Sequence, residues 1–315
     1  MEGDTLYDAL QLINTYIGRR LNLSHARVAS RGHGCGRAGH PGTPGCPGPA
    51  SEVRRVMSLL VSEGTAGDFI RALAPRLDPD PGRYMAELVG ERRFTAFHER
   101  SLLHDILIAL DAPGDAPLAI RAALTGGGEQ QGYDIKLQGG MVFAGDRAVR
   151  TLGGQELQVA TRLRGTFDHA ILTFSPPVAG ASPVSLEVRQ GKPPRVTVQT
   201  GHAPPRLHVQ LSLEADILAA GQGQAAGGQA YLRQVQEHAA REIAERAKNV
   251  IGRAQAELAT DIFGFGRHAQ PQFLAWSQWR DWRWMERFPQ ATVEVEVSLE
   301  IRRVGLHHTV GGRPK

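Results

Sequence analysis

The chain has 315 residues, a formal net charge of +4 and 41% apolar residues, which is close to ordinary globular usage. Because single domains usually hold about 100–200 residues, two to three domains are expected. The mild positive charge does not require a nucleic-acid partner. No apolar run approaches the length of a transmembrane helix. The first four residues, MEGD, have neither the basic nor the apolar region of a signal peptide, so none is expected.

Helical spacing of apolar side chains predicts an amphipathic helix over residues 5–20, followed by a short strand over 21–29. The apolar face of this helix consists of Leu6, Leu10, Ile13 and Ile17. Residues 31–49 break the pattern, because they are almost entirely Gly, Pro, Ala, Arg, His and Cys. This composition predicts an irregular loop of a length that is unusual inside a compact domain.

The next part of the chain predicts a strand over 52–61, helices over 65–73 and 99–110, and a turn over 78–82. The Gly-rich segment 123–132 is interpreted as a link and as the main domain boundary.

The second half alternates strand and helix patterns without a regular β-α-β rhythm. The predicted strands are two short ones within 136–150 around a Gly145-Asp146 turn, one over 168–174, a hairpin of 184–189 with 195–200, and two long strands over 207–217 and 292–303. The predicted helices are 155–163, 229–258 and 270–285, and residues 219–228 are interpreted as a linker.

These elements favour an α+β fold with mixed or antiparallel sheets and packed helices. We expect an N-terminal domain over 1–125, which includes the irregular segment 31–49, and a C-terminal domain over 133–315. A subdivision of the second domain near residue 205 stays open.

No catalytic motif was found among the phosphate-binding, zinc-protease and hydrolase signatures. The glycines at 126–128 are interpreted as a linker rather than a phosphate cradle. His33, Cys35, His40 and Cys46 could form a zinc set, but their gaps are looser than those of structural zinc sites, so a plain loop is favoured. His307 and His308 would point to opposite faces of a strand. No catalytic, cofactor-binding or metal residue is therefore assigned, and no enzyme activity is expected.

All four tryptophans, Trp276, Trp279, Trp282 and Trp284, lie within nine residues and beside Arg280, Arg283 and Arg287. Aromatic and basic side chains together can stack nucleobases or rest at a membrane surface. The favoured interpretation is that they pack the last helix onto a sheet, with an interaction surface as the alternative. Just upstream, the sequence DIFGFG at 261–266 predicts a tight glycine exit from the long helix, with its apolar side chains in the core.

Residues 256–306 resemble the C-terminal end of the Ger(x)C family, the C subunits of nutrient receptors in spore germination. The positions that match its pattern are Asp261, Gly264, Gly266, Trp282, Phe288, Pro289, Arg302, Arg303 and Gly305. Segments 139–165, 3–28 and 51–70 are similar to the family as well, so the resemblance covers nearly the whole chain.

The resemblance implies a non-enzymatic germinant-receptor subunit that acts in sporulating bacteria with the membrane-embedded A and B subunits. It also implies a lipoprotein at the outer face of the spore inner membrane, in contact with the membrane surface and with no cofactor or nucleic acid. A soluble ligand-binding module of the envelope is the alternative, and a nucleic-acid binder around residues 276–287 is a third hypothesis.

Two features depart from the family. Its members begin with a signal peptide and a lipid-bearing Cys, whereas Cys35 follows Gly32, His33 and Gly34 instead of an apolar run. We therefore expect this chain to lack the anchor. The composition of residues 31–49 further suggests a segment read out of frame, as in a damaged or misassigned gene.

Overall fold

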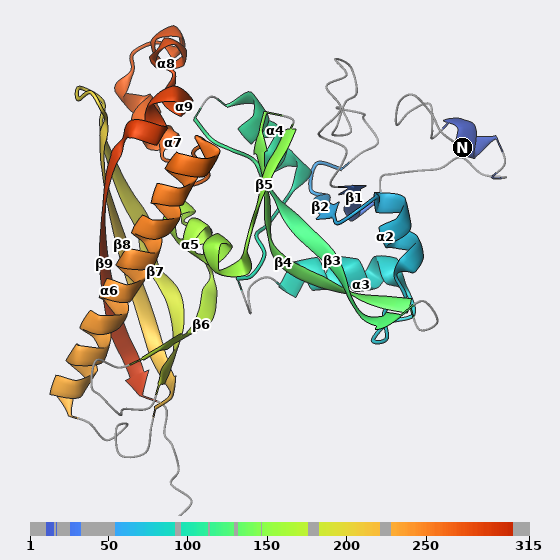
Figure 1. Ribbon diagram of the computed structural model, residues 1–315, viewed down its shortest axis with the longest axis horizontal. Helices are drawn as coiled ribbons and strands as arrows, with labels where there is room; N and C mark the ends of the chain where they lie inside the picture. The colour runs from blue at the N-terminus through green and yellow to red at the C-terminus, as the bar shows by residue number, and fades with distance from the viewer. Residues whose placement is uncertain are drawn as a thin grey trace, which may run out of the picture. The chain divides into compact units, whose positions relative to one another are not determined.

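The structure is a computed structural model that describes residues 11–15, 17, 26–32, 54–91, 96–112, 114–128, 132–145, 147–175, 183–220 and 228–304. The chain forms two compact units, shown in Figure 1. The N-terminal unit comprises Met1–Arg92 and Phe97–Leu157, and the C-terminal unit comprises Arg93–Ala96 and Gln158–Lys315. Each unit contains one mixed sheet with helices, which confirms the predicted α+β fold.

The sheet of the N-terminal unit has five strands in the order β1-β2-β3-β4-β5. They are β1 (Val28–Gly32), β2 (Ser58–Ser62), β3 (Leu118–Gly128), β4 (Gly132–Ala144) and β5 (Arg147–Leu152). The pairs β1–β2 and β2–β3 are parallel, and the pairs β3–β4 and β4–β5 are antiparallel. Leu60 and Ile120 pack on one face, while Leu59 and Met141 pack on the other, so helices can cover both.

Three helices accompany this sheet: α2 (Ala66–Ala72), α3 (Pro81–Gly90) and α4 (Leu103–Asp111). The predictions of α2 and α4 are confirmed. The turn predicted over 78–82 is instead the start of α3, where the Asp80 carboxylate accepts hydrogen bonds from the Gly82 and Arg83 amides at 2.9 and 3.1 Å. Asp80 as cap and Pro81 at the first helical position form a helix start rather than a free turn.

The segment predicted as a link over 123–132 is the closed end of the β3–β4 hairpin, where Thr125 pairs with Asp134 and Gly128 with Gly132. Its glycines serve the turn: Gly126 and Gly127 have φ of 64° and 69°, a left-handed conformation that side chains disfavour. The compact units divide at Leu157, so the ranges 1–125 and 133–315 do not coincide with them. Of the helix predicted over 5–20, residues 11–14 are helical and most of the rest lies outside the described residues, as does most of 31–49.

Helix α5 (Gly154–Arg164) spans the division between the units and agrees with the predicted helix. The C-terminal unit then has a four-stranded sheet in the order β6-β7-β8-β9. The strands are β6 (His169–Phe174), β7 (Val184–Gln199), β8 (Arg206–Ala219) and β9 (Thr292–Val304). The first two pairs are antiparallel, and β8–β9 is parallel because helix α6 (Gln229–Arg253) connects those strands.

The hairpin predicted from 184–189 and 195–200 is wrong, because both halves belong to the single strand β7. The Gly191-Lys192-Pro193-Pro194 sequence does disturb the strand, since the register with β8 shifts between Gln190 and Lys192 and again before Arg195. Strand β8 continues past both shifts and keeps the two halves in one ladder. The sequence of residues 191–194, which by itself predicts a turn, therefore forms bulges within one strand.

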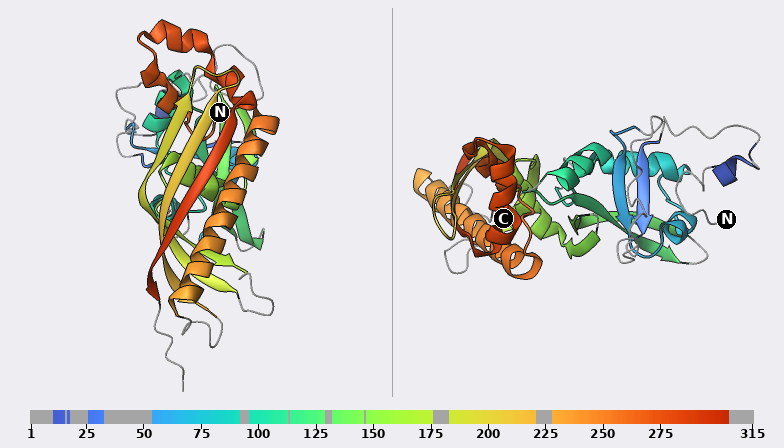
Figure 2. Two further views of the ribbon diagram at one scale, coloured as in Figure 1. Left: turned by 90° about the vertical axis from the view of Figure 1, so that its left-hand side faces the viewer. Right: turned by 90° about the horizontal axis from the view of Figure 1, so that it is seen from above.

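The core of the C-terminal unit lies between its sheet and α6, which runs along the strands in Figure 2. Strand β8 buries every second side chain, as its alternation predicted. Helix α6 buries a stripe at every fourth position, namely Val235, Ala239, Ile243, Ala247 and Ile251. Alanines in this stripe let the helix lie close to the sheet, while the charged side chains take the outer face.

Candidate functional site: the aromatic cap

Residues 260–290, here called the aromatic cap, follow α6 and its last π-helical turn η3 (Ala254–Leu258). The cap contains α7 (Gly266–Ala269), η4 (Gln270–Gln272), α8 (Trp276–Trp282), α9 (Trp284–Arg287) and η5 (Phe288–Gln290), and it is labelled at the upper end of α6 in Figure 1. The single helix predicted over 270–285 is therefore wrong. Phe273 is extended, and Arg283 is left-handed with φ 50° and ψ 62°, so the chain turns twice where one helix was expected.

Asp261 is the centre of this cap, and its side chain is fully buried at 0% exposure. Its Oδ1 accepts a hydrogen bond from the Phe263 amide at 2.9 Å, and its Oδ2 accepts from the Gly266 amide at 2.9 Å and from the Trp284 Nε1–H at 2.8 Å. A buried carboxylate is tolerated only where donors compensate its charge. The DIFGFG exit is thus closed around a carboxyl group whose two oxygens accept hydrogen bonds from the cap itself.

Aromatic rings form a continuous row through the cap. Trp282 stacks on Trp284 with ring centroids 5.5 Å apart and planes inclined by 16°. The row extends to Phe273 and Trp279 on one side, at 5.2 and 5.7 Å from Trp282. On the other side its members are Trp284, Phe288, Phe265 and Phe263. Trp279, Trp282 and Trp284 therefore pack against one another and against phenylalanines of the cap, whereas Trp276, which was expected to pack with them, is 53% exposed. Packing of these tryptophans onto the sheet stays a prediction.

Amide side chains and one arginine fix the cap to the rest of the unit. Gln255 donates to the carbonyls of Phe288 and Ala291 at 2.9 and 2.7 Å. Gln272 donates to the Val198 carbonyl at the end of β7 at 2.6 Å. Arg164 at the end of α5 donates to the Ile262 carbonyl at 2.7 Å. The cap is consequently an integral part of the sheet end and not a loosely attached loop.

One edge of the cap has exposed apolar side chains. Leu274, two residues before α8, is 99% exposed, and Trp276, the first residue of α8, is 53% exposed. Arg280 and Asp281 lie on the same short helix with 3.5 Å between Nε and Oδ1, and both are exposed. We call Leu274, Trp276 and Arg280 the exposed tip. An unburied leucine beside an unburied tryptophan is the kind of surface that a partner can cover.

The remaining charges of the cap are mostly paired within it. The Arg283 Nη1 atom lies 3.4 Å from the Glu286 Oε1 atom. Arg287 lies over the Trp282 ring at 5.5 Å and donates to the Trp282 carbonyl at 2.7 Å. Burial lowers the pKa of His268, and the charge of Arg267 lowers it further. Arg283 and Arg287 thus contribute to the internal contacts of the cap.

The other candidate residues lie outside the part of the chain that the structure describes. The residues of the zinc set, His33, Cys35, His40 and Cys46, lie outside the described residues, and so do His307 and His308. Within the part of the chain that the structure describes, no group of three or more His, Cys, Asp or Glu side chains could hold a metal ion. None of the described helices has the length and apolar character needed to cross a membrane.

Sequence reasoning found the cap but missed its organisation. The DIFGFG motif pointed to a glycine exit, yet Asp261 was not identified as an acceptor for Trp284. The roles of Gln255 and Gln272 gave no sequence signal, because each partner lies more than thirty residues away. The exposure of Leu274 could not be read from a residue type that is usually buried.

Comparison with known proteins identifies the family to which this chain is similar. The family model described as "Spore germination B3/GerAC like, C-terminal" matches residues 138–305, which include the sheet β6–β9 and the whole aromatic cap. The crystal structure of the GerBC protein is similar with a TM-score of 0.64, covering 92% of this chain and 83% of that one. Its sequence identity of 15% means that this likeness concerns the fold. No curated protein matches the sequence. The chain belongs to the GerAC-like family of spore germination proteins.

Proposed function

We propose that this protein is the C subunit of a nutrient germinant receptor and that it acts in spore germination by binding other subunits rather than by catalysis. The observation that carries this proposal is the family match over residues 138–305. The fold likeness to GerBC extends over most of the chain and supports the same role. By resemblance, the partners are the membrane-embedded A and B subunits, and the place of action is the outer face of the spore inner membrane.

The aromatic cap supports a binding role because its exposed tip is rigidly held. Trp279, next to Trp276 on α8, is buried and contacts Phe273 and Trp282 at ring distances of 5.5 and 5.7 Å. The backbone beneath Leu274 is held by the Gln272 bond to Val198. Apolar side chains presented on a fixed backbone lose little conformational entropy when a partner covers them. We propose that the exposed tip is part of the contact with a receptor subunit.

Co-expression with the A and B subunits of the same receptor tests the assignment. We expect the tagged chain to retain both subunits after detergent extraction and to restore nutrient germination to spores that lack their own C subunit. If the folded chain retains neither subunit and restores no germination, the receptor assignment fails.

The tip is tested separately with the double variant Leu274→Ser and Trp276→Ser. We expect this variant to fold, since both side chains are exposed, and to lose subunit retention by about tenfold or more, as hot-spot residues do. Ile171→Ser is the matched control, because Ile171 is an exposed apolar residue on β6 at 59% exposure. Equal retention by the tip variant and the control would reject the tip as the contact while leaving the receptor assignment intact.

A further inference from the structure

Arg162 on α5 is an arginine buried within the C-terminal unit, and it has no charged partner among the residues that the structure describes. Only 3% of its surface is exposed. The Nε and Nη2 atoms are fully buried, and neither has a hydrogen-bond partner in the described part of the chain. Its Cζ atom lies over the Phe167 ring, 4.4 Å from the ring centroid. An aromatic ring attracts a cation but accepts no strong hydrogen bond from it, and the buried Nε and Nη2 donors remain unsatisfied within the described residues.

The unpaired atoms form the edge that binds a carboxylate side-on. The same chain shows this geometry elsewhere: Arg83 uses its Nε and Nη2 atoms to hold the two oxygens of Asp78 at 2.6 and 2.9 Å. Arg162 presents the same pair of donors, but no carboxylate of the described residues receives them. Two parallel donors at this spacing match the two oxygens of a carboxylate group.

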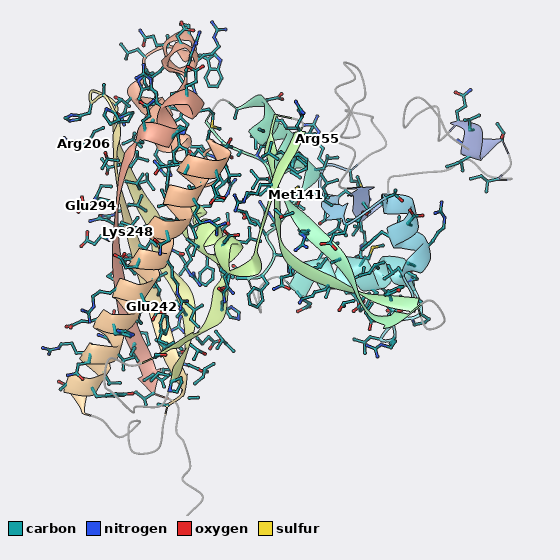
Figure 3. The ribbon with its side chains drawn as sticks, viewed as in Figure 1. Arg55, Met141, Arg206, Glu242, Lys248 and Glu294 are labelled. Atoms are coloured by element: carbon teal, nitrogen blue, oxygen red, sulfur yellow. The ribbon has the colours of Figure 1, made fainter. Side chains whose placement is uncertain are left out.

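The surroundings of Arg162 are also positive. Burial lowers the pKa of Arg162 to about 9, and the charge of Arg246 on α6 contributes in the same direction. With a pKa of about 9, the Arg162 guanidinium stays charged at neutral pH. Arg246 lies 5.6 Å from the Phe174 ring and pairs with Glu242, which is labelled on α6 in Figure 3. Two arginines and one glutamate leave one positive charge, which one monoanion would neutralise.

We infer that Arg162 and Arg246 form a binding site for the carboxylate group of a small monoanionic ligand. Arg162 supplies the side-on pair of donors, Phe167 supports the guanidinium from its face, and Arg246 adds the second positive charge. The Arg246 side chain is 43% exposed, so this member of the proposed site reaches solvent. The inference does not depend on the receptor assignment, because it rests on α5, α6 and their neighbours alone.

Thermal unfolding in sodium acetate and in sodium chloride of equal ionic strength tests the site. We expect acetate to raise the midpoint of the wild-type protein in a saturable manner, because a ligand that binds only the folded state stabilises it. Arg162→Met should abolish the saturable response to acetate, and Arg162→Lys should weaken acetate binding by about tenfold or more, since lysine keeps the charge but not the side-on pair. Arg246→Gln should also weaken it.

Arg241→Gln is the control, because Arg241 is an exposed residue of the same helix and its replacement changes the net charge equally. It should leave the acetate response unchanged. If Arg162→Met does not fold, NMR of the Arg162 Nε–H in the wild-type protein provides the second test, since bound acetate should shift that signal. Failure of acetate to raise the midpoint, persistence of the response in folded Arg162→Met, or an equal Arg162-dependent response to sulfate would overturn the proposal of a carboxylate site.

Discussion

The Asp261 Oδ2 atom accepts a hydrogen bond of 2.8 Å from the Trp284 Nε1–H, between residues twenty-three positions apart. This bond joins the exit of α6 to the helix that leads into β9. Asp261 also receives the Phe263 and Gly266 amides, so one buried carboxylate fixes both the turn and the aromatic row. The fold of the cap is therefore determined by a polar contact at the centre of an otherwise aromatic cluster.

Asp261→Asn should destabilise the C-terminal unit by about 2–4 kcal/mol, because a neutral amide accepts weaker bonds and turns an N–H toward a donor. Urea unfolding followed by tryptophan fluorescence measures this, and all four tryptophans lie in the cap. Trp284→Phe removes only one donor and keeps an aromatic ring, so the expected loss is smaller, about 1–2 kcal/mol. Equal stability of Asp261→Asn and the wild type would contradict the central role of this carboxylate.

Gly264 should not tolerate a side chain, because its φ of 72° lies in the left-handed region. Gly264→Ala is expected to lower the free energy of unfolding by about 1–2 kcal/mol through backbone strain. Gly252→Ala is the matched control, since Gly252 lies inside α6 and a Cβ there would meet nothing within 4 Å. This second change should stabilise the protein by about 0.5–1 kcal/mol. Destabilisation of the same size at both positions would argue against the strain at Gly264.

Local periodicity was sufficient to predict the elements that contribute most to the C-terminal core. The alternation of Leu207, Val209 and Leu211 and the helical spacing that includes Val235 and Ile243 are both determined by burial of one face. These patterns persist because a slip by one residue would expose an entire apolar face. The burial of Trp279 and Trp284 was also predictable, because large aromatic side chains clustered in one segment usually pack in a core.

Elements that depend on distant partners could not be predicted in the same way. Gly191-Lys192-Pro193-Pro194 is a turn signal by its residues, but pairing with β8 makes it a pair of bulges. The glycines of 123–132 fit a flexible link or a tight hairpin equally well, and only the pairing of β3 with β4 decides between them. Within the cap, nothing in the sequence distinguishes Asp261 from other acidic residues, because its contact with Trp284 is visible only in the folded structure.

Removal of the exposed tip should not affect stability, although removal of the adjacent packing residue should. The double variant Leu274→Ser and Trp276→Ser is expected to stay within about 0.5 kcal/mol of the wild type, because both side chains are solvated. Trp279→Ala should lose about 3–5 kcal/mol, since Trp279 is buried between Phe273 and Trp282. Urea unfolding followed by circular dichroism compares them without depending on tryptophan emission. A large loss in the tip variant would show that the tip is structural.

The stability of the C-terminal unit should fall in acid because of a charge network on β7, β8 and β9. Arg189 donates to Asp216 at 2.8 Å and to Glu214 at 3.3 Å, and the first of these bonds is the main cause that lowers the pKa of Asp216. The pKa of Glu214 is lowered mainly by its hydrogen bond from Arg302 and to a smaller extent by its hydrogen bond from Arg189. Since both carboxyl groups have folded pKa values below their unfolded ones, the unfolded state binds more protons in acid. The stabilisation is complete above the unfolded pKa values and is lost as the pH falls through the folded ones.

Arg189→Gln should therefore flatten the dependence of stability on pH below about pH 5, because Asp216 then titrates more nearly as it does in the unfolded chain. The measurement is the urea midpoint at a series of pH values from neutral into acid, followed by tryptophan fluorescence. Arg241→Gln, which changes the net charge equally on the exposed side of α6, should keep the wild-type slope. The same flattening in both variants would assign the acid sensitivity to total charge, whereas flattening in Arg189→Gln alone would assign it to the specific bonds from Arg189.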